Sequence, residues 1–282
     1  MTLQHCRERA HIGCQGWNYD DWVTGPAGAS IFYPRGTRPP AMLGVYARAF
    51  ETVEVDSTFY AIPSAATVEG WTRRTPDGFT FSLKLPQEIT HERGLRDGSL
   101  ALLEEFCERA RLLKEKLAVV LIQLPPQFIA TVENVRALRE FLAALPRDVR
   151  FGVEFRSHDW MTDEVVDMLA KYTVALALVE GQWIARPRIF QFADRLINDF
   201  AYLRWMGGRD LTRFDVVQRP QDKNLRAWSE MLAQLCLRTQ AIYAYFSNFY
   251  EGHAPASANK LKRLCGQQTV EAKDLEAQPS LF

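Results

Sequence analysis

The sequence predicts a TIM-type (β/α)8 barrel with eight parallel strands, not necessarily a regular one, and three observations support this fold class. Eight short apolar segments recur about every 25 to 40 residues along the 282-residue chain. Most of them are separated by segments with helical periodicity, which is the rhythm of an alternating strand–helix protein. No Pro-, Ser- or Gly-rich linker divides the chain near its middle. We therefore expect one barrel domain over residues 1–265 and a polar C-terminal tail over residues 266–282.

The strand candidates are short apolar or alternating segments that end at polar residues or at proline. Residues 80–85 alternate in the manner of a strand and stop at Pro86. Residues 118–124 are apolar except for Gln123, as expected for a strand buried on both faces. The eight candidates are residues 11–13, 52–55, 80–85, 118–124, 151–153, 174–179, 200–205 and 241–246.

The intervening helices are predicted from apolar side chains at helical spacing and from capping residues. Ser64 and Thr162 are in position to cap two of them. The predicted helices cover residues 41–50, 100–113, 132–145 and 223–237, and others start after Ser64, after Thr162 and near Pro255. An open doubly wound sheet is the competing architecture, but no G-x-G-x-x-G sequence follows the first strand.

Composition and charge exclude several classes of partner. The 34 basic and 34 acidic residues cancel, so we expect no general nucleic-acid binding and no attraction to an anionic membrane. Five scattered cysteines without a C-x-x-C pair predict neither a disulfide framework nor a structural zinc site. The first residues are too polar for a secretory signal, and no apolar run is long enough to span a bilayer. These features predict a soluble, reduced, cytoplasmic protein; its oligomeric state is left open.

Polar residues gather where the predicted strands end. In barrels of this type the carboxyl ends of the strands and the loops after them form the active site. The segment FGVEFRSHDW, residues 151–160, shows this most clearly, because titratable groups of both signs crowd its end. The residues at the strand ends are Gln15, Trp17, Asp56, Thr58, Tyr60, Lys84, Gln123, Glu154, Arg156, His158, Glu180, Arg204, Asn248, Tyr250 and His253.

Four of these residues are candidates for catalysis. Lys84 alternates with Leu83 and Leu85 and so is expected to point into the barrel, where it either pairs with Glu154 or receives an anionic group of the substrate. Glu154 is either the structural partner of Lys84 or a general base with a shifted pKa. His158 and His253 are candidates for the second acid or base.

The remaining candidates are expected to bind substrate. Arg156 and Arg204 either hold a carboxylate or phosphate or bridge to Glu154 or Glu180. Aromatic side chains with cations between them suit a sugar ring or a nucleobase. The expected substrate-binding residues are Arg156, Arg204, Asn248, Trp17, Thr58, Tyr60, Gln123 and Trp160.

No metal or other cofactor is predicted. Asp56, Glu154, Glu180 and His158 are the side chains from which a divalent-metal site would have to be assembled. The seventh strand offers Arg204 where a ligand would help, and no H-x-x-E-H spacing exists. Cys14 lacks the neighbouring motif of a catalytic thiol.

Several ordered motifs together resemble the YecE-like family of uncharacterised proteins. They are G-C-Q-G-W-N-Y-x-x-W with F-Y-P, F-E-T-V-E-V-D-S-T-F-Y, W-x-x-x-T-P-x-G-F-x-F-x-x-K, Q-L-P-P, V-E-F-R-x-x-x-W and Y-x-Y-F-S-N-x-Y-E-G-H-A-P. The resemblance covers residues 13–264 and implies a TIM-type barrel but no established reaction. Its motif positions fall on Gly16, Trp17, Glu54, Thr58, Phe59, Tyr60, Lys84, Gln123, Pro125, Glu154, Arg156, Trp160, Arg204, Asn248 and Gly252. This chain departs from the family pattern at Cys14, Gln15 and Ser247.

We expect an enzyme, possessing hydrolase, lyase or isomerase activity of unknown specificity, that acts by acid/base chemistry on a small anionic, phosphorylated or sugar-like substrate at the barrel mouth. Two alternatives stay open. One is a metal-assisted phosphoesterase or nucleic-acid-processing enzyme, which rests on fold analogy. The other is a metabolite-binding module without catalysis.

Overall fold

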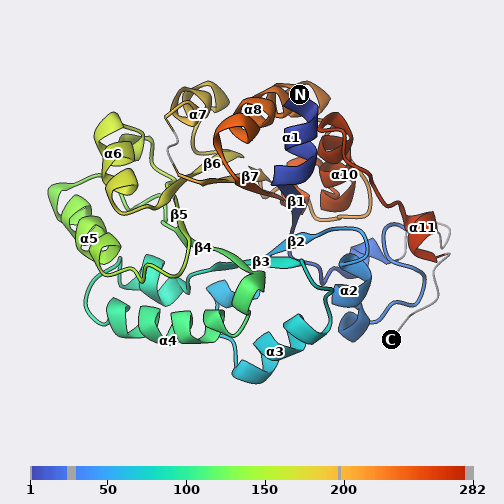
Figure 1. The fold of residues 1–282 in the computed structure, drawn as a ribbon, viewed down its shortest axis with the longest axis horizontal. Coiled ribbons are helices and arrows are strands. Elements are labelled where there is room, and N and C mark those ends of the chain that lie inside the picture. Colours follow the sequence, from blue (N-terminus) through green and yellow to red (C-terminus); the bar gives the residue numbers. More distant parts are fainter. Residues whose placement is uncertain (1, 24–29, 196–197, 277–282) are drawn as a thin grey trace.

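Eight parallel strands close into a barrel in the order in which they occur along the chain, as the sequence predicts (Figure 1). The computed structural model describes residues 2–23, 30–195 and 198–276. Parallel pairing of the first strand with the last closes the barrel. The strands are β1 Ala10–Gln15, β2 Thr52–Val55, β3 Thr80–Lys84, β4 Leu117–Gln123, β5 Phe151–Glu154, β6 Ala175–Gly181, β7 Phe200–Gly207 and β8 Ala241–Phe246.

Helices surround the barrel and join consecutive strands (Figure 1). Both predicted caps are present, since Ser64 Oγ accepts a hydrogen bond from the Thr67 amide and Thr162 Oγ1 accepts one from the Val165 amide, at 3.2 and 3.4 Å. The helices are α1 Thr2–Arg9, α2 Pro39–Tyr46, α3 Ala65–Arg73, α4 Ser99–Arg111, α5 Val132–Ala143, α6 Asp163–Lys171, α7 Arg186–Ala193, α8 Asp222–Arg238, α9 Asn248–Glu251, α10 Ala254–Leu264 and α11 Ala272–Glu276.

The helices differ from the sequence prediction at three places. The helix expected over residues 41–50 begins at Pro39, because proline is well suited to a first turn whose amides have no partner within the helix. Neither α1 nor α7 was expected: α1 is mostly polar, and α7 carries a proline near its start that masks its short apolar pattern. The expected polar tail contains α11, whose Leu275 is buried; residues 277–282 of that tail lie outside the described residues. Among the described residues, no helix is long and apolar enough to cross a bilayer.

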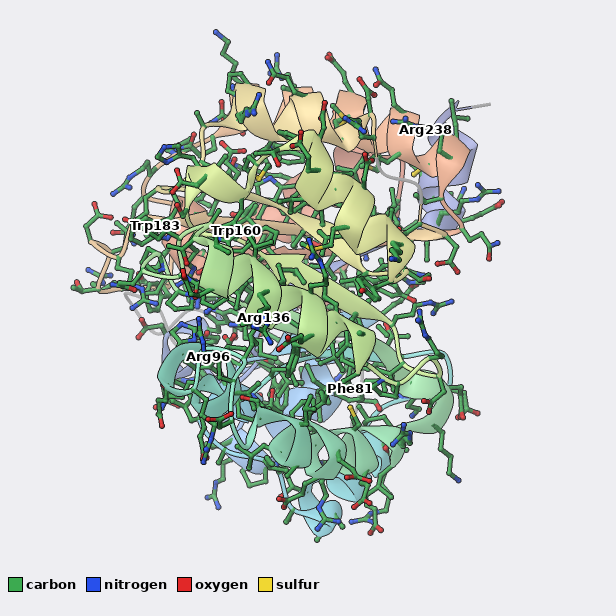
Figure 2. The ribbon with its side chains drawn as sticks, turned by 90° about the vertical axis from the view of Figure 1, so that its left-hand side faces the viewer. Phe81, Arg96, Arg136, Trp160, Trp183 and Arg238 are labelled. Atoms are coloured by element: carbon green, nitrogen blue, oxygen red, sulfur yellow. The ribbon has the colours of Figure 1, made fainter. Side chains whose placement is uncertain are left out.

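The core has two parts, one between the helices and the barrel and one inside the barrel. Side chains such as Phe81 and Trp160 fill the outer part (Figure 2). The inner part is a smaller apolar cluster that includes Tyr202 and Tyr245. The Tyr245 hydroxyl lies 2.8 Å from both the Thr52 and Ser82 hydroxyls, so this polar group is satisfied inside the barrel.

Charged residues follow this inner cluster along the strands toward their carboxyl ends. Two residues after Thr52, Ser82 and Tyr202 come Glu54, Lys84 and Arg204. Because side chains alternate between the two faces of a strand, these charged residues also point into the barrel. The barrel therefore changes from an apolar interior to a charged one as it opens.

Three of the five cysteines meet outside the barrel, although their sequence positions are scattered. Cys6 of α1 and Cys236 of α8 have their sulfur atoms 2.9 Å apart, and the thiol of Cys265, after α10, is hydrogen-bonded to Cys6. All five cysteines are buried and none forms a disulfide. Sequence spacing gave no sign of this cluster, because it arises from the packing of three helices.

Candidate functional site

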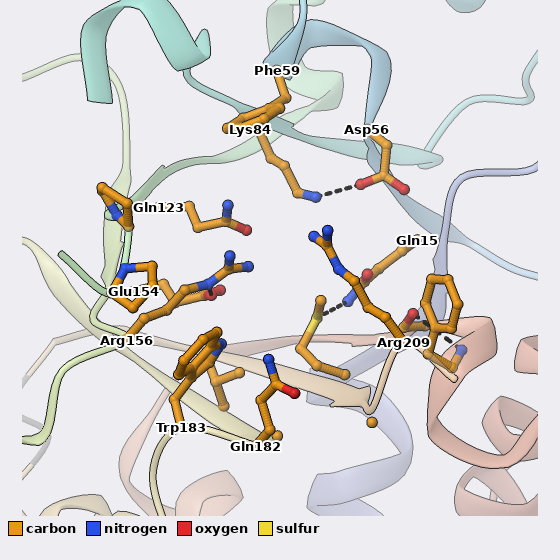
Figure 3. A pocket seen from close by; sticks show the side chains of 18 of the residues that line it. Gln15, Asp56, Phe59, Lys84, Gln123, Glu154, Arg156, Gln182, Trp183 and Arg209 are labelled. Carbon is orange, nitrogen blue, oxygen red and sulfur yellow. Dashed lines mark hydrogen bonds and ion pairs between the residues drawn. The ribbon is translucent and has the colours of Figure 1, made fainter. Parts of the chain in front are cut away.

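A cavity of about 780 Å³ opens at the carboxyl ends of the barrel strands. This is where (β/α)8 barrels build their active sites, and the volume lies within the range typical of small-molecule sites. The loops after β2, β3, β5, β6 and β7 contribute to its wall (Figure 3). Its principal polar and aromatic residues are Gln15, Asp56, Phe59, Tyr60, Lys84, His91, Gln123, Glu154, Arg156, Gln182, Trp183, Arg209 and Phe249.

A fully buried arginine lies beneath the cavity and joins two carboxylates. Arg204 Nη2 donates to Glu54 Oε1 at 2.8 Å, and its Nη1 donates to Glu154 Oε2 and to Gln123 Oε1. The Tyr202 hydroxyl donates to the other oxygen of Glu54 at 2.6 Å. Burial alone lowers the pKa of Arg204, but the two carboxylates outweigh it and raise that pKa above its usual value. Arg204 thus supports the site from below and does not itself line the cavity.

Two further cations connect this buried layer to the cavity. Arg156 Nε donates to Glu154 Oε1 at 2.8 Å, and Lys84 Nζ lies 3.4 Å from Glu54 Oε1 and in contact with Asp56 Oδ1. Of the two alternatives for Lys84, the pairing with Glu154 is wrong, because β2 lies beside β3, and β2 and the turn after it supply both partners of the lysine. The Lys84 and Arg156 side chains are 10% and 11% exposed and both line the cavity.

Glu154 is held as a carboxylate by two guanidinium groups. Burial raises the pKa of Glu154, but Arg204 and Arg156 outweigh burial and lower it below its usual value. Each carboxylate oxygen accepts a hydrogen bond from one arginine. This geometry suits a residue that positions Arg156 better than the proton-transfer role that the sequence suggested.

Several cavity residues were not among the sequence candidates, and three of them, His91, Arg209 and Trp183, bear on the chemistry of the site. His91 lies in a turn of π-helix, Glu88–Glu92, after β3; its Nδ1 is 2.8 Å from the Thr90 hydroxyl and its ring meets Phe59 edge-on. Burial, followed by the charge of Arg156, lowers the pKa of His91. Arg209 and Trp183 lie in the loops after β7 and β6. Proximity to a strand end was a usable signal for all three, but the surrounding loops show no periodicity that selects one residue over another.

The two histidines predicted from sequence as acids or bases do not line the cavity. The His158 side chain is 84% exposed and faces Asp159, because a short helical turn directs it outward from the end of β5. His253 is buried at the start of α10, where Nδ1–H donates to the Phe214 carbonyl oxygen at 2.8 Å.

Burial of His253 is expected to make the protein less stable in acid. Burial lowers the pKa of His253 from 6.5 to about 4, so the unfolded chain binds this proton first. Stability is therefore complete above pH 6.5 and falls as pH decreases toward 4. Between pH 7 and pH 4.5, the free energy of unfolding of wild type is expected to fall by about 2 to 3 kcal/mol more than that of His253→Asn. Asparagine keeps a hydrogen-bond donor but does not titrate. Urea unfolding at several pH values measures how the free energy of unfolding of each protein changes with pH. Equal slopes for wild type and His253→Asn would show that His253 is not the cause of the acid loss.

Besides Arg204, four predicted substrate-binding residues have structural contacts instead of cavity contacts. Thr58 Oγ1 accepts a hydrogen bond from the Lys84 amide at 3.0 Å. Asn248 Oδ1 accepts one from Trp22 Nε1 at 3.1 Å and one from the Ala254 amide at 3.0 Å.

The other two are tryptophans packed among aromatic rings. Trp160 stacks with Phe128 and Phe155, and Trp17 meets Trp71 edge-on. All four residues lie outside the cavity lining. Tyr60, Gln123 and Arg156 do line the cavity, as do Lys84 and Glu154.

The side chains considered for a metal do not converge. Asp56 and Glu154 line the cavity, whereas His158 is exposed and Glu180 turns toward α8, where Trp228 Nε1 and Asn224 Nδ2 donate to it. Burial raises the pKa of Glu180. In the part of the chain that the structure describes, no group of three or more His, Cys, Asp and Glu side chains is arranged to hold a metal ion.

The fold and the cavity define a (β/α)8-barrel protein with a cavity at the carboxyl ends of its strands. The chain belongs to the DUF72 family, described as a protein family of unknown function, whose model matches residues 11–280. It is 27% identical to the UPF0759 protein YunF of Bacillus subtilis, over 94% of this chain and 95% of that protein. It is 33% identical to the UPF0759 protein YecE of Escherichia coli K12, over 52% of this chain and 48% of that protein.

A solved structure supports the same assignment. A DUF72 family protein from Thermotoga maritima superimposes with a TM-score of 0.75 and 25% identity, covering 92% of this chain and 99% of that one. The resemblance to the YecE-like family that the sequence motifs indicated is thereby confirmed, together with the barrel fold.

Proposed function

We propose that this protein is an enzyme that acts on a small anionic substrate bound in the cavity. The observation that carries the proposal is the convergence of three cations from different strand ends: Lys84 from β3, Arg156 after β5 and Arg209 after β7 (Figure 3). Arg156 uses only Nε for Glu154, and Arg209 has no partner among the described residues. Guanidinium groups with unused N–H donors are well suited to a carboxylate or phosphate.

The charge balance of the site also favours an anion. The cavity and the layer beneath it contain four cations, Lys84, Arg156, Arg204 and Arg209, against three carboxylates, Glu54, Asp56 and Glu154. One positive charge is left over, whereas the whole chain has a formal net charge of zero. Because the cavity is partly shielded from water, this excess acts more strongly there than on an open surface.

We assign proton transfer to His91 in place of Glu154. A lowered pKa keeps the His91 ring neutral near pH 7, and a neutral imidazole accepts a proton. Asp56 and Lys84 form an ion pair on the cavity wall. Asp56 adds a carboxylate to that of Glu154, and Lys84 adds a hydrogen-bond donor. Hydrolysis, elimination and isomerisation all remain compatible with this set.

The test is binding of anions by wild type and by variants of the two arginines. Inorganic phosphate and small phosphorylated or carboxylated compounds are expected to raise the melting temperature of wild type. Arg209→Gln and Arg156→Gln are expected to weaken binding at least about tenfold, because charge-assisted hydrogen bonds contribute about 1.5 to 3 kcal/mol.

Arg136→Gln is the matched control. Arg136 lies on α5, is 78% exposed and pairs only with Glu140 among the described residues (Figure 2). This variant should bind anions as wild type does. Failure of every anion to stabilise wild type, or full affinity in Arg209→Gln, would exclude the proposed anion site.

Metabolite binding without catalysis is a second candidate, favoured by one observation. Glu54, Asp56 and Glu154 are each paired with a cation, so none offers a carboxylate without a charged partner for proton transfer. His91→Gln separates the two functions. If the protein is an enzyme, the variant binds the anion normally but loses turnover, whereas a binding module shows no turnover in either form.

A further inference from the structure

We propose that the anionic substrate is a sugar phosphate or sugar acid, whose ring hydroxyls bind Gln15, Gln123 and the Asp56–Lys84 pair. This inference rests on the proposed function, because it names the class of substrate for the same cavity. Its evidence is separate from that for the anion site: it comes from neutral and paired groups, not from the excess positive charge.

Two buried amides in the cavity wall have hydrogen-bonding groups without good partners. Gln123 is 5% exposed; its Oε1 accepts from Arg204, whereas its Nε2 has no partner among the described residues. Gln15 is 3% exposed; its Nε2 contacts the Met206 sulfur at 3.0 Å, a weak acceptor, and its Oε1 has no partner in the described part of the chain. Neither of these two atoms is fully enclosed, so each is open to the cavity, and a ligand that pairs with it takes the place of water.

These amides require a ligand that both donates and accepts hydrogen bonds. The Nε2 group of Gln123 needs an acceptor, and Oε1 of Gln15 needs a donor. An ionised phosphate or carboxylate oxygen only accepts. A hydroxyl group does both, so the substrate has hydroxyl groups in addition to its charge.

The Asp56–Lys84 pair extends the same pattern. Lys84 Nζ is a donor and the Asp56 carboxylate an acceptor, side by side on the cavity wall (Figure 3). Two neighbouring hydroxyls can bind one to each ion. Asp56 is 34% exposed on its side chain, which leaves its carboxylate accessible for this contact.

The arrangement around the cavity favours a sugar over a nucleobase. The groups that donate and accept come from four neighbouring strands, which form one continuous arc of the barrel: Gln15 from β1, Asp56 after β2, Lys84 from β3 and Gln123 from β4. Gln182, after β6, also directs its amide inward (Figure 3). A sugar ring has hydroxyls on successive carbons along its perimeter and can present several of them to such an arc. A nucleobase concentrates its polar atoms along its edges and needs flat surfaces on both faces.

Trp183 supplies one flat apolar surface. Trp183 is 44% exposed and, like Arg156, lines the cavity (Figure 3). Such an indole packs against the C–H face of a sugar ring while the polar groups bind the hydroxyls. The ring contact and the anion site therefore belong to the same cavity.

The experiment compares anions that differ in their hydroxyl groups. Calorimetric titrations of wild type use glucose 6-phosphate, ribose 5-phosphate, glucuronate, phenyl phosphate, adenosine monophosphate, inorganic phosphate and glucose. At least one of glucose 6-phosphate, ribose 5-phosphate and glucuronate is expected to bind about tenfold or more tightly than phenyl phosphate, adenosine monophosphate and inorganic phosphate. Comparison of glucose 6-phosphate with glucuronate shows whether the site prefers a phosphate or a carboxylate.

Variants connect this preference to the named residues. Gln123→Met and Gln15→Met keep the side-chain length but remove the amide, and each is expected to weaken binding of the preferred sugar anion about 3- to 10-fold while inorganic phosphate binds unchanged. Trp183→Ala should behave in the same way, and Arg136→Gln should match wild type throughout.

The outcomes separate this inference from the proposed function. If phenyl phosphate or adenosine monophosphate binds as tightly as every sugar anion, the sugar assignment is wrong while the anion site stands. If both glutamine variants weaken inorganic phosphate as much as the sugar anion, the amides do not recognise hydroxyls, and the inference is again overturned. If no anion binds wild type, the anion site fails and the sugar assignment fails with it.

Discussion

Arg204→Met is expected to lower the free energy of unfolding by about 3 to 5 kcal/mol. Arg204, Glu54 and Glu154 have side chains that are essentially inaccessible to water, and the arginine is the shared partner of both carboxylates. Methionine fills much of the space but leaves two buried negative charges near each other. Lys84 and Arg156 remain to offset them only in part, because each contacts just one of the two carboxylates.

Urea unfolding of wild type and variants measures this effect. Arg111→Gln removes an ion pair between exposed side chains, Arg111 and Asp148, and is expected to cost no more than about 1 kcal/mol. Adding Glu154→Gln to Arg204→Met removes one of the stranded charges and should recover part of the lost stability. A loss in Arg204→Met no larger than that of the Arg111 control would show that the buried charges are not coupled as the geometry indicates.

The barrel was predictable because its strands and most of its helices are regular. The 52–55 and 241–246 segments match β2 and β8 at both ends, and Ser64 and Thr162 cap helices as expected. The elements that escaped prediction lack that regularity: α1 has no apolar stripe, and the π-helical turn at Glu88–Glu92 has no simple sequence pattern. Element boundaries set by proline, as at Pro39, also depend on which turn the chain adopts.

The site was predictable only as far as the alternation of side chains along a strand determines which of them point into the barrel. Alternation correctly indicated that Lys84 points into the barrel. It gave no information about partners, because which carboxylate meets Lys84 depends on how neighbouring strands are placed side by side. Glu54 appeared in the sequence only as a family motif position, yet in the structure it joins Arg204, Lys84 and Tyr202.

The orientation of side chains in the loops after the strands could not be predicted from the sequence. His91, His158 and His253 all follow strands in the sequence, but only His91 lines the cavity among these three. The direction of each ring is set by local turns and by packing against residues distant in sequence, such as Phe214 for His253. A sequence pattern identifies the end of the barrel where function resides; the backbone after each strand decides which side chain reaches it.

Gly207→Ala is expected to lower the free energy of unfolding by about 3 kcal/mol and to weaken anion binding. Gly207 ends β7 with a φ of +64°, and a Cβ atom there would lie 2.0 Å from the Phe249 carbonyl oxygen and 2.4 Å from its carbon. These are backbone atoms of α9, so the clash cannot be relieved by rotating a side chain. Separating β7 from α9 would also move Arg209, two residues further along the chain, away from its place in the cavity.

Gly36→Ala is the control that isolates the steric part of this effect. Gly36 also has a positive φ, +79°, but a Cβ atom there has no neighbour within 4 Å. Its substitution should cost only the conformational penalty of about 1 kcal/mol and leave anion binding unchanged. Urea unfolding and phosphate titration of both variants provide the comparison. Equal losses of stability would mean that backbone conformation alone accounts for the glycine at 207, and that close packing of β7 against α9 does not fix the loop that holds Arg209.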